Sequence, residues 1–476
     1  MFQPVTLPLW LLVLILVFAG VTFASHFLFP SVRWFFRRRM EKVVSRLNAR
    51  LDRPIQPFKL MARHDMIIRL THDPKVAEVV AEEAAQSGEP QTVVLERVRR
   101  YAREIVPAFS ASVYFGVGIR LSRWLARHLY NVHLDDEKLG SISPDATVVF
   151  VMNHRSNMDY VLVTYLAAQR STLSYAVGEW ARVWPLSTLI RSMGAYFIRR
   201  RSDRPLYRRV LSRYVQMATA EGVTQAIFPE GGLSLNGRTA PARLGIMSYI
   251  VQDERPAGRD VVFVPVAINY DRVVEDRVLV AADAAGVRRF RAPIASILAF
   301  VSRHVWRALL RRFRRFGDAV VRFGTPVSLA EFQKGRTGDV TAELTRHLMA
   351  EVTRNVTVLS VPLVAAAWGD ADETDRDGLI SRAAALEGEL AAKGAHFHLP
   401  PEGIPEAVDR ALDIFVMRRL VSRKGDRLVL NPAGRPLLAF YAASILQLFD
   451  ADAETLSSKR PGKPKKVNPS GHKITK

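Results

Sequence analysis

The chain has 476 residues, of which 49% are hydrophobic, and a formal net charge of +22. This length and apolar content allow more than one compact unit with a sizeable core, and they exclude a chain that is disordered throughout. The sequence contains no cysteine, which excludes a disulfide framework, a catalytic thiol and thiolate metal sites.

The first apolar segment, Leu7–Phe29, contains no Asp, Glu, Lys or Arg. As a helix it is long enough to cross a bilayer core of about 30 Å, and it exceeds the usual core of a cleaved signal peptide. We therefore expect a transmembrane anchor within residues 1–32. The basic residues that follow predict a single-pass protein of the cell (inner) membrane whose body faces the cytoplasm; they are Arg33, Arg37, Arg38, Arg39 and Lys42.

The next region, residues 33–130, is expected to be helical. Apolar residues recur at helical intervals in Asp73–Gln86, Thr92–Ile105 and Ala108–Leu129.

From residue 131 to residue 329 we expect an α/β layered domain with a largely parallel sheet, because short apolar runs alternate with helical patterns. The predicted strands are Thr147–Met152, Leu173–Val177, Ala195–Ile198, Thr224–Phe228, Val261–Ile268 and Ala319–Phe323. The predicted helices are Met158–Gln169, Trp184–Ser192, Pro205–Glu221 and Ala240–Val251.

The positive charge predicts an acidic partner, either anionic membrane lipid or nucleic acid. Much of it follows the anchor or lies in Arg288–Arg315, where apolar residues recur at helical spacing between arginines. Such a basic amphipathic helix is typical of a lipid interface, and it is equally typical of a core-facing helix with a solvated arginine side. The position of the charge favours membrane lipid, and no nucleic-acid partner is expected.

Residues 330–456 are expected to form a mostly helical C-terminal region. It includes an acidic, linker-like stretch at Gly369–Gly378, helices over Ala411–Leu420 and Arg435–Leu448, and strands around Gly425-Asp426. The tail from 457 to 476 is rich in Lys, Pro, Gly and Ser, a composition typical of a disordered segment.

The candidate catalytic residues follow the first predicted strand of the α/β region, in Asn153-His154-Arg155-Ser156-Asn157-Met158-Asp159-Tyr160. A histidine acts well as a general base when a second group orients its ring and favours the imidazolium, and Asp159 is the nearest candidate. Positions five apart on one helix point in different directions, so the pair requires a strand end, a turn and a helix start. The alternative is that Ser156 and Asp159 only cap the helix.

Three further blocks follow in order: Gly194-Ala195-Tyr196-Phe197-Ile198-Arg199-Arg200-Arg201, then Phe228-Pro229-Glu230-Gly231-Gly232-Leu233-Ser234-Leu235-Asn236-Gly237-Arg238, then Val264-Pro265-Val266-Ala267-Ile268-Asn269-Tyr270. The order and flanks of the four blocks resemble the glycerol-phosphate and lysophospholipid acyltransferase superfamily, and within it the membrane-bound glycerol-3-phosphate acyltransferases. The resemblance covers the chain from about Thr71 to about Phe449.

This resemblance implies a His/Asp general-base mechanism in which His154 takes the proton of the acceptor hydroxyl and Asp159 orients the ring. It implies phosphate binding by Arg199 and Arg200, a contact of Glu230 with a substrate hydroxyl, and close approach of backbone and ligand at Gly231 and Gly232. Further substrate contacts are implied for Arg155, Ser234 and Arg238. A solvated basic turn at Arg199 and a plain glycine turn after Glu230 are the structural alternatives. No metal ligand set is predicted, and no cofactor is expected besides the acyl donor.

The implied reaction is transfer of a fatty acyl group from acyl-CoA or acyl carrier protein to the sn-1 hydroxyl of glycerol 3-phosphate, the step that opens phospholipid synthesis. In close relatives arginines usually stand where this chain has Leu233 and Leu235, which favours lysophosphatidate as an alternative acceptor. A hypothesis of another class is an inactive membrane or nucleic-acid binding protein. The sequence does not indicate the oligomeric state.

Overall fold

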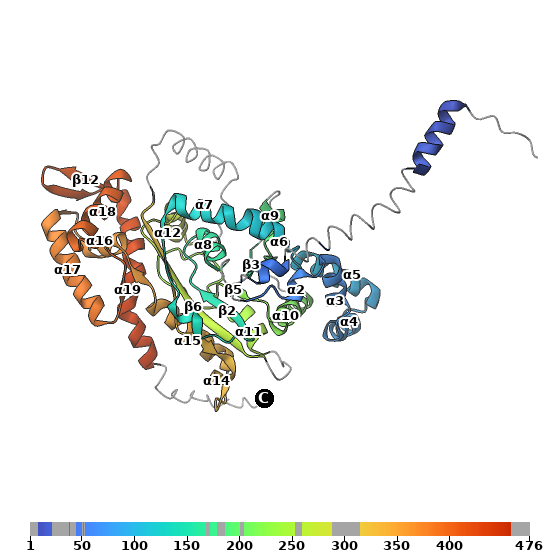
Figure 1. Cartoon of the computed structure of the whole chain (residues 1–476). Helices are drawn as coiled ribbons and strands as arrows, with labels where there is room; N and C mark the ends of the chain where they lie inside the picture. Colours follow the sequence, from blue (N-terminus) through green and yellow to red (C-terminus); the bar gives the residue numbers. More distant parts are fainter. Residues whose placement is uncertain are drawn as a thin grey trace, which may run out of the picture. The chain divides into compact units, whose positions relative to one another are not determined.

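The computed structural model describes residues 8–20, 38, 44–49, 51, 53–167, 172–178, 186–199, 204–252, 259–287 and 315–457. They fall into two compact units, one formed by residues 1–55 with 169–171 and the other by residues 56–168 with 172–476. All strands among the described residues belong to the second unit (Figure 1).

In the first unit, residues 9–20 are helical and carry exposed apolar side chains. Of the predicted anchor Leu7–Phe29, residue 7 and residues 21–29 lie outside the described residues. Within the described ranges, no helix combines the length and apolarity needed to cross a membrane.

The centre of the second unit is an eight-stranded sheet. Its strands are β1 (Asn131–Asp135), β2 (Thr147–Met152), β3 (Ser174–Val177), β4 (Tyr196–Phe197), β5 (Gln225–Ile227), β6 (Val261–Tyr270), β7 (Asp318–Phe323) and β8 (Val327–Ser328). Their order is β1-β7-β6-β2-β5-β3-β4, with β8 paired to β6.

The sheet is mixed, so the prediction of a largely parallel sheet is right only for part of it. Strands β6, β2, β5, β3 and β4 are parallel, as the alternation of strands and helices predicts. Strands β7 and β8 run antiparallel to β6, and β1 pairs in parallel with β7. Strand direction depends on how the chain returns from β6 to β7, and local periodicity does not carry that information.

The sheet is covered on both faces, which explains why β2 is an unbroken apolar run. All residues of β2 are buried. Successive residues face opposite sides of the sheet and therefore pack into two different hydrophobic clusters. Val148 and Phe150 pack in a cluster with α7, α8, α12 and the C-terminal helices. Val149 and Val151 pack in a cluster with α3–α5, α10, α11 and α15.

The N-terminal region of the second unit is helical, as predicted. Asp73 caps α4 by accepting a hydrogen bond from the N–H of Lys75, and Gly88 ends that helix with a positive φ of 69°. The helices are α2 (Pro57–Leu60), α3 (Arg63–Thr71), α4 (Pro74–Ser87), α5 (Gln91–Ile105), α6 (Ala111–Val113), a π-helical turn at Tyr114–Gly118, and α7 (Ile119–Leu129).

The helices between the strands agree with the predicted alternation. They are α8 (Met158–Ala167), α9 (Leu186–Ser192), α10 (Pro205–Ala220), α11 (Gly245–Val251) and α12 (Asp276–Ala284). The predicted basic helix Arg288–Arg315 lies outside the described residues, apart from Arg315.

The C-terminal region is mostly helical, and Figure 1 shows α16 to α19 grouped together in orange and red. Buried α16 packs against α17, α18 and α19. The predicted hairpin around Gly425-Asp426 is β12 and β13, and the acidic stretch expected as a linker supplies β10, which pairs with β13.

The elements of this region are α14 (Leu329–Gln333), α15 (Val340–Arg354), β9 (Thr357–Val358), α16 (Ser360–Trp368), β10 (Glu373–Asp375), α17 (Arg376–Ala392), β11 (His396–Phe397), α18 (Ile404–Met417), β12 (Val421–Lys424), β13 (Arg427–Leu430) and α19 (Arg435–Ser457). Short 3-10 helices lie at Glu137–Ser141 and Pro432–Gly434.

Candidate active site

The site is built at the carboxyl end of β2, where the chain turns into α8. Asn153 joins this strand end to β6, because its side chain donates to the carbonyl of Ile268 (3.0 Å) and accepts from the N–H of the same residue (2.8 Å). Two parallel strands are thereby held together directly beside His154. This is the edge of an α/β sheet at which ligands usually bind.

His154 and Asp159 meet as the sequence predicts. The Nδ1 of His154 lies 2.9 Å from the Oδ2 of Asp159, and both side chains are buried. The same carboxylate oxygen accepts the N–H groups of Arg155 (2.7 Å) and Ser156 (3.0 Å), so the turn folds around it. Asp159 therefore caps the turn and orients the imidazole at once, and the two readings of the motif do not exclude each other.

The contact with Asp159 determines which ring nitrogen of His154 can act as a base. An ionised carboxylate only accepts hydrogen bonds, so Nδ1 carries the proton and Nε2 keeps its lone pair. The ring packs against Phe228, with ring centroids 4.3 Å apart, and against the edge of Tyr160 at 5.3 Å. These aromatic contacts and the Asp159 bond fix the ring in one orientation.

Tyr270 is a site residue to which sequence reasoning gave no role. Its hydroxyl donates to the second oxygen of Asp159, Oδ1, at 2.5 Å. Tyr270 ends β6, next to β2 in the sheet, and burial raises the pKa of its hydroxyl well above the ordinary value. Tyr270 could have been identified from its position, because it ends the fourth block on a strand that ends at the same edge of the sheet as β2.

Glu275 is a second residue that the motifs did not reveal. Its carboxylate accepts from the hydroxyl of Ser156 (2.7 Å) and from the backbone and side-chain N–H groups of Asn157 (3.2 and 3.0 Å). Burial raises the pKa of Glu275. The turn between β2 and α8 is thus held from one side by Asp159 and from the other by the segment that follows β6.

Glu230 is brought to the catalytic turn, with both carboxylate oxygens bonded to backbone. Oε1 accepts the N–H of His154 (2.8 Å) and Oε2 accepts the N–H of Ala240 (2.9 Å). Burial raises the pKa of Glu230 to about 8, although these two hydrogen bonds act in the opposite direction. In this geometry Glu230 positions the backbone of the base.

The rest of the third block also contacts the turn. The N–H of Ser234 donates to the carbonyl of His154 at 2.8 Å, and its hydroxyl donates to the carbonyl of Arg238 at 2.6 Å. Arg238 itself forms an ion pair with Asp450. Leu233 and Leu235 pack against the core, so these side chains contribute to packing.

The glycines of this block allow close approach at particular points. Gly231 has a positive φ of 69°, and a Cβ there would lie 3.0 Å from the Cδ of Arg243, whereas Gly232 does not have a positive φ. Gly237 has a φ of 86°, and a Cβ there would lie 1.9 Å from the carbonyl oxygen of Phe440 in α19. Gly237 therefore permits the loop and the C-terminal helix to touch.

Arg155 is buried beside His154 and contacts the same two segments. Its Nη1 donates to the carbonyl of Gly237, and its guanidinium lies 5.4 Å from the ring centroid of Phe440. Its Nε and Nη2 are buried and have no hydrogen-bond partner among the described residues. Burial lowers the pKa of this guanidinium.

Arg199, the arginine of the second block that the structure describes, is engaged elsewhere. It follows β4 at the edge of the sheet, and its Nε and Nη2 donate to the two oxygens of Glu104 at 2.9 and 2.7 Å. The aromatic rings of Tyr101 and Tyr207 flank it at 5.5 and 5.3 Å. Arg200 lies outside the described residues, so the second block's part in phosphate binding stays a prediction.

Comparison with known protein families gives two matches along the chain. Residues 133–269 match the model described as Acyltransferase. Residues 304–457 match the model described as Glycerol-3-phosphate acyltransferase C-terminal region. The first match contains the first three motif blocks and the fourth as far as Asn269, and the second contains the helices α15 to α19.

Among curated proteins the chain is similar to bacterial enzymes named Glycerol-3-phosphate acyltransferase. That of Pseudomonas putida (strain GB-1) is 30% identical over 57% of this chain and 32% of its own length. That of Pseudomonas entomophila (strain L48) is 27% identical over 86% of this chain and 52% of its own length. The chain thus spans between about a third and about half of these curated relatives.

A solved structure, the 1-acyl-sn-glycerophosphate (LPA) acyltransferase PlsC from Thermotoga maritima, is 18% identical and covers 61% of this chain and 94% of its own. Its TM-score of 0.32 is too low to support a statement about this chain.

Proposed function

Because the chain belongs to the glycerol-3-phosphate acyltransferase family, we propose that it transfers a fatty acyl group from an acyl thioester, acyl-CoA or acyl carrier protein, to the sn-1 hydroxyl of glycerol 3-phosphate. The observation that carries this proposal is the buried pair of His154 and Asp159, joined at 2.9 Å at the carboxyl end of β2. A protein that only binds membranes or nucleic acid needs no such pair.

The proposed reaction begins when Nε2 of His154 takes the proton of the acceptor hydroxyl. The hydroxyl oxygen attacks the thioester carbon, and the resulting tetrahedral intermediate expels the thiolate, which takes the proton back from the imidazolium. An ester and a free thiol result. Asp159 stabilises the imidazolium through Nδ1, and Tyr270 and two backbone N–H groups hold Asp159 in place. The reaction as proposed requires no metal and no further cofactor.

For the acceptor phosphate we propose contacts from Arg155 and from the second-block arginines, Arg199 and Arg200. Arg155 supports this because it adjoins the base and has two guanidinium nitrogens without a partner among the described residues. To bind phosphate, Arg199 would have to release Glu104. Two phosphate oxygens can accept from the same two guanidinium nitrogens that now donate to the Glu104 carboxylate. The proposed roles of Gly231, Gly232, Ser234 and Arg238 are to shape the loop beside the acceptor.

The experiment that tests the proposed function compares wild-type protein with His154→Ala. Each is incubated with acyl-CoA or acyl-loaded carrier protein and with either glycerol 3-phosphate or lysophosphatidate, and the acylated products are followed. We expect transfer to glycerol 3-phosphate by the wild type and a loss of at least about a thousandfold in the variant, as for other general bases that act with an oriented carboxylate. Exposed His72 at the end of α3 gives a control variant, His72→Ala, that should keep full activity.

The outcomes separate the alternatives. Transfer only to lysophosphatidate would replace the proposed acceptor. No consumption of either thioester by the folded wild-type chain would contradict acyl transfer and favour a binding protein. A large fall in the melting temperature of His154→Ala would assign the pair a structural role.

We also propose attachment to the cell (inner) membrane, with the catalytic unit on the cytoplasmic side. Its support is the uncharged sequence Leu7–Phe29, the exposed apolar side chains of residues 9–18, and one face of α7 with the π-helical turn before it. That face exposes Val117, Leu121 and Trp124 beside Arg120, Arg123 and Arg127, a combination suited to anionic lipid.

Extraction of isolated membranes tests this attachment. An apolar anchor should keep the protein on the membrane in high salt and release it only in detergent, because salt screens charges and leaves apolar burial intact. Complete release by salt would show that the attachment is electrostatic.

A further inference from the structure

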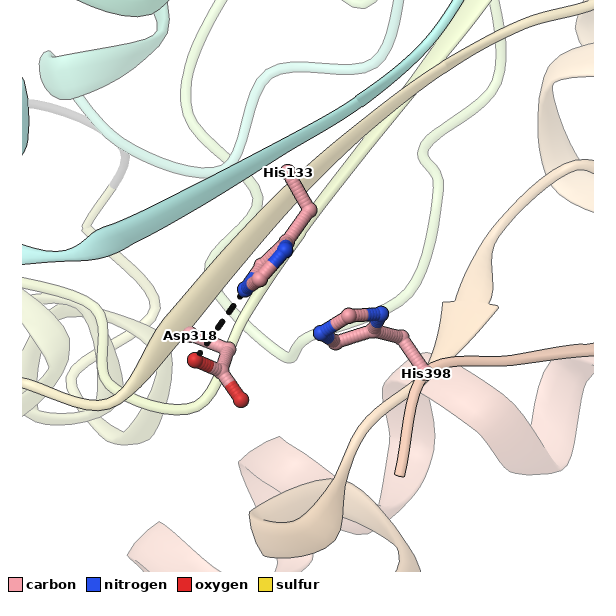
Figure 2. A group of neighbouring side chains, drawn as sticks. All are labelled: His133, Asp318 and His398. Carbon is pink, nitrogen blue, oxygen red and sulfur yellow. Dashed lines mark hydrogen bonds and ion pairs between the residues drawn. The ribbon is translucent and has the colours of Figure 1, made fainter. Parts of the chain in front are cut away.

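Three side chains from separate parts of the chain form a group away from the motif blocks. His133 lies on β1, Asp318 begins β7, and His398 follows β11 in the C-terminal region. Figure 2 shows His398 facing the pair formed by His133 and Asp318. We propose that these three residues bind one divalent transition-metal ion of the zinc class.

The distances within the group suit such an ion. The Nε2 of His133 lies 3.4 Å from the Oδ1 of Asp318, and one ligand atom from each of the three residues lies within 4.8 Å of the others. In a tetrahedral site with bonds of about 2.0–2.1 Å, neighbouring ligand atoms are about 3.3–3.4 Å apart. The same separation is long for a direct hydrogen bond between a ring nitrogen and a carboxylate. The fourth position would be open to solvent, since all three residues are half-buried.

The surroundings hold the ligands in a form that a metal can use. Asn131 donates from Nδ2 to the Oδ1 of Asp318 at 3.0 Å and is itself held by Arg315, whose Nη1 lies 2.6 Å from its Oδ1. Such contacts from a second residue orient a ligating carboxylate.

The backbone of His398 is held in place beside β9. The N–H of His398 donates to the carbonyl of Val358 at 2.9 Å, which anchors this residue beside β9. Its ring centroid lies 3.8 Å from that of His133, with the planes at 40°. One ring nitrogen of His398 lies on the side of His133 and Asp318 (Figure 2), within 4.8 Å of their ligand atoms. Coordination therefore requires the three ligand atoms to draw closer together.

The proposed ion would connect two parts of the chain. His133 and Asp318 belong to the outer strands of the sheet, and His398 belongs to the segment between β11 and α18. A bound ion would therefore fasten the C-terminal region to the sheet, a structural role that involves neither His154 nor a substrate. Ligands that bind only the folded state stabilise it by mass action.

Zinc titration of the untagged full-length chain, after treatment with a chelator, tests the proposal. We expect one zinc ion per chain in calorimetric titration and a rise of a few degrees in the melting temperature. The chain has no cysteine, so this binding can only come from nitrogen and oxygen ligands. His133→Ala, His398→Ala and Asp318→Asn should each weaken zinc binding by at least about tenfold and abolish the rise in melting temperature.

His396→Ala is the matched control, because His396 lies on β11 two residues before His398, near Arg322 and Asp135, and outside the group. It should bind zinc like the wild type. The proposal is overturned if the wild type binds no zinc at micromolar concentration, if the three ligand variants bind it unchanged, or if His396→Ala loses it equally. Should an alanine variant fail to fold, Asp318→Asn decides, since it keeps the side-chain shape: retained binding overturns the proposal and lost binding supports it.

Discussion

At the scale of single residues, Asp159 receives more hydrogen bonds than an orienting carboxylate needs. Besides His154 it binds two backbone N–H groups and the hydroxyl of Tyr270. A buried carboxylate supplied with this many donors has little freedom to turn, so the imidazole that it contacts also keeps one orientation. The sequence predicts the His154/Asp159 pair from the spacing of two residues, but Tyr270 comes from a strand more than a hundred residues later.

Tyr270→Phe should lower kcat by about tenfold and leave the KM for the acceptor nearly unchanged, because the hydroxyl acts on the base through Asp159 and does not touch the acceptor. The measurement is steady-state kinetics with both substrates varied. Tyr130→Phe is the control. Its ring lies 5.3 Å from that of Tyr270, but its hydroxyl donates to the carbonyl of Arg272, so kcat should be unchanged. Equal losses in both variants would assign Tyr270 to packing.

Arg199→Gln should raise the acceptor KM by about tenfold with a small change in kcat if this arginine binds phosphate, since the interaction would be the same in the ground and transition states. Glu104→Gln removes its partner and frees the guanidinium, so its KM should not rise. If both variants lower the melting temperature alike without changing KM, the ion pair is structural and Arg199 has no part in the acceptor site.

At the scale of elements, local patterns predicted strands β2 to β7 of the large sheet, but they predicted neither β1 nor β8 and did not predict the direction of β7. Strand β2 is recognisable because both of its faces are buried, and the bounds of α5 follow its apolar spacing. The direction of β7 depends on a partner strand about fifty residues away, which periodicity cannot specify. The contact between Gly237 and α19 is equally non-local, although the glycine itself was visible.

Gly237→Ala should destabilise the fold by several kcal/mol, on the order of 3 kcal/mol, because a Cβ would overlap the carbonyl of Phe440 in addition to the strain of a positive φ. Gly88→Ala is the matched control. Its φ of 69° is also positive, but a Cβ there meets nothing within 4 Å, so the cost should be about 1 kcal/mol. Chemical denaturation measures both. Equal costs would show that the loop and α19 move apart easily.

At the scale of the whole molecule, the C-terminal region belongs to the same compact unit as the sheet. Tyr441 accepts the N–H of Val273 at 3.0 Å and donates to Asp276, and Arg418 pairs with Asp276 at 2.6 Å. The side chain of Asn269 donates to the carbonyl of Thr357 at 2.9 Å. The sequence did not reveal that Phe440 and Tyr441 contact segments around the catalytic turn, because contacts between distant segments leave no local pattern.

Stability should decrease as pH rises from about 5 to 8. Burial raises the pKa of Glu230 from 4.5 to about 8 and that of Asp271 from 3.8 to about 7. Between the ordinary and raised values the folded chain holds a proton that the unfolded chain has released, so folding loses about 1.4 kcal/mol per pH unit and group. Thermal unfolding across this range measures the slope.

The variant with both Glu230→Gln and Asp271→Asn should be less stable overall, because each carboxylate accepts two backbone N–H groups and an amide accepts through one oxygen only. The melting temperature of this double variant should nevertheless depend less on pH than that of the wild type. The difference between the two melting temperatures should therefore become smaller as pH rises. A wild type whose stability increases between pH 5 and 8 would contradict the raised pKa values.

The contact of Arg155 with Gly237 and Phe440 limits how the two halves of the chain can be recombined with those of a relative. A chimaera that joins the motif-bearing half of one relative to the C-terminal half of another would place an unmatched α19 against a buried arginine that adjoins the base. Exchange at the boundary between the two matched family regions should therefore impair catalysis even though no catalytic residue changes. The two halves are expected to tolerate recombination only when Gly237 and the helix around Phe440 come from the same parent.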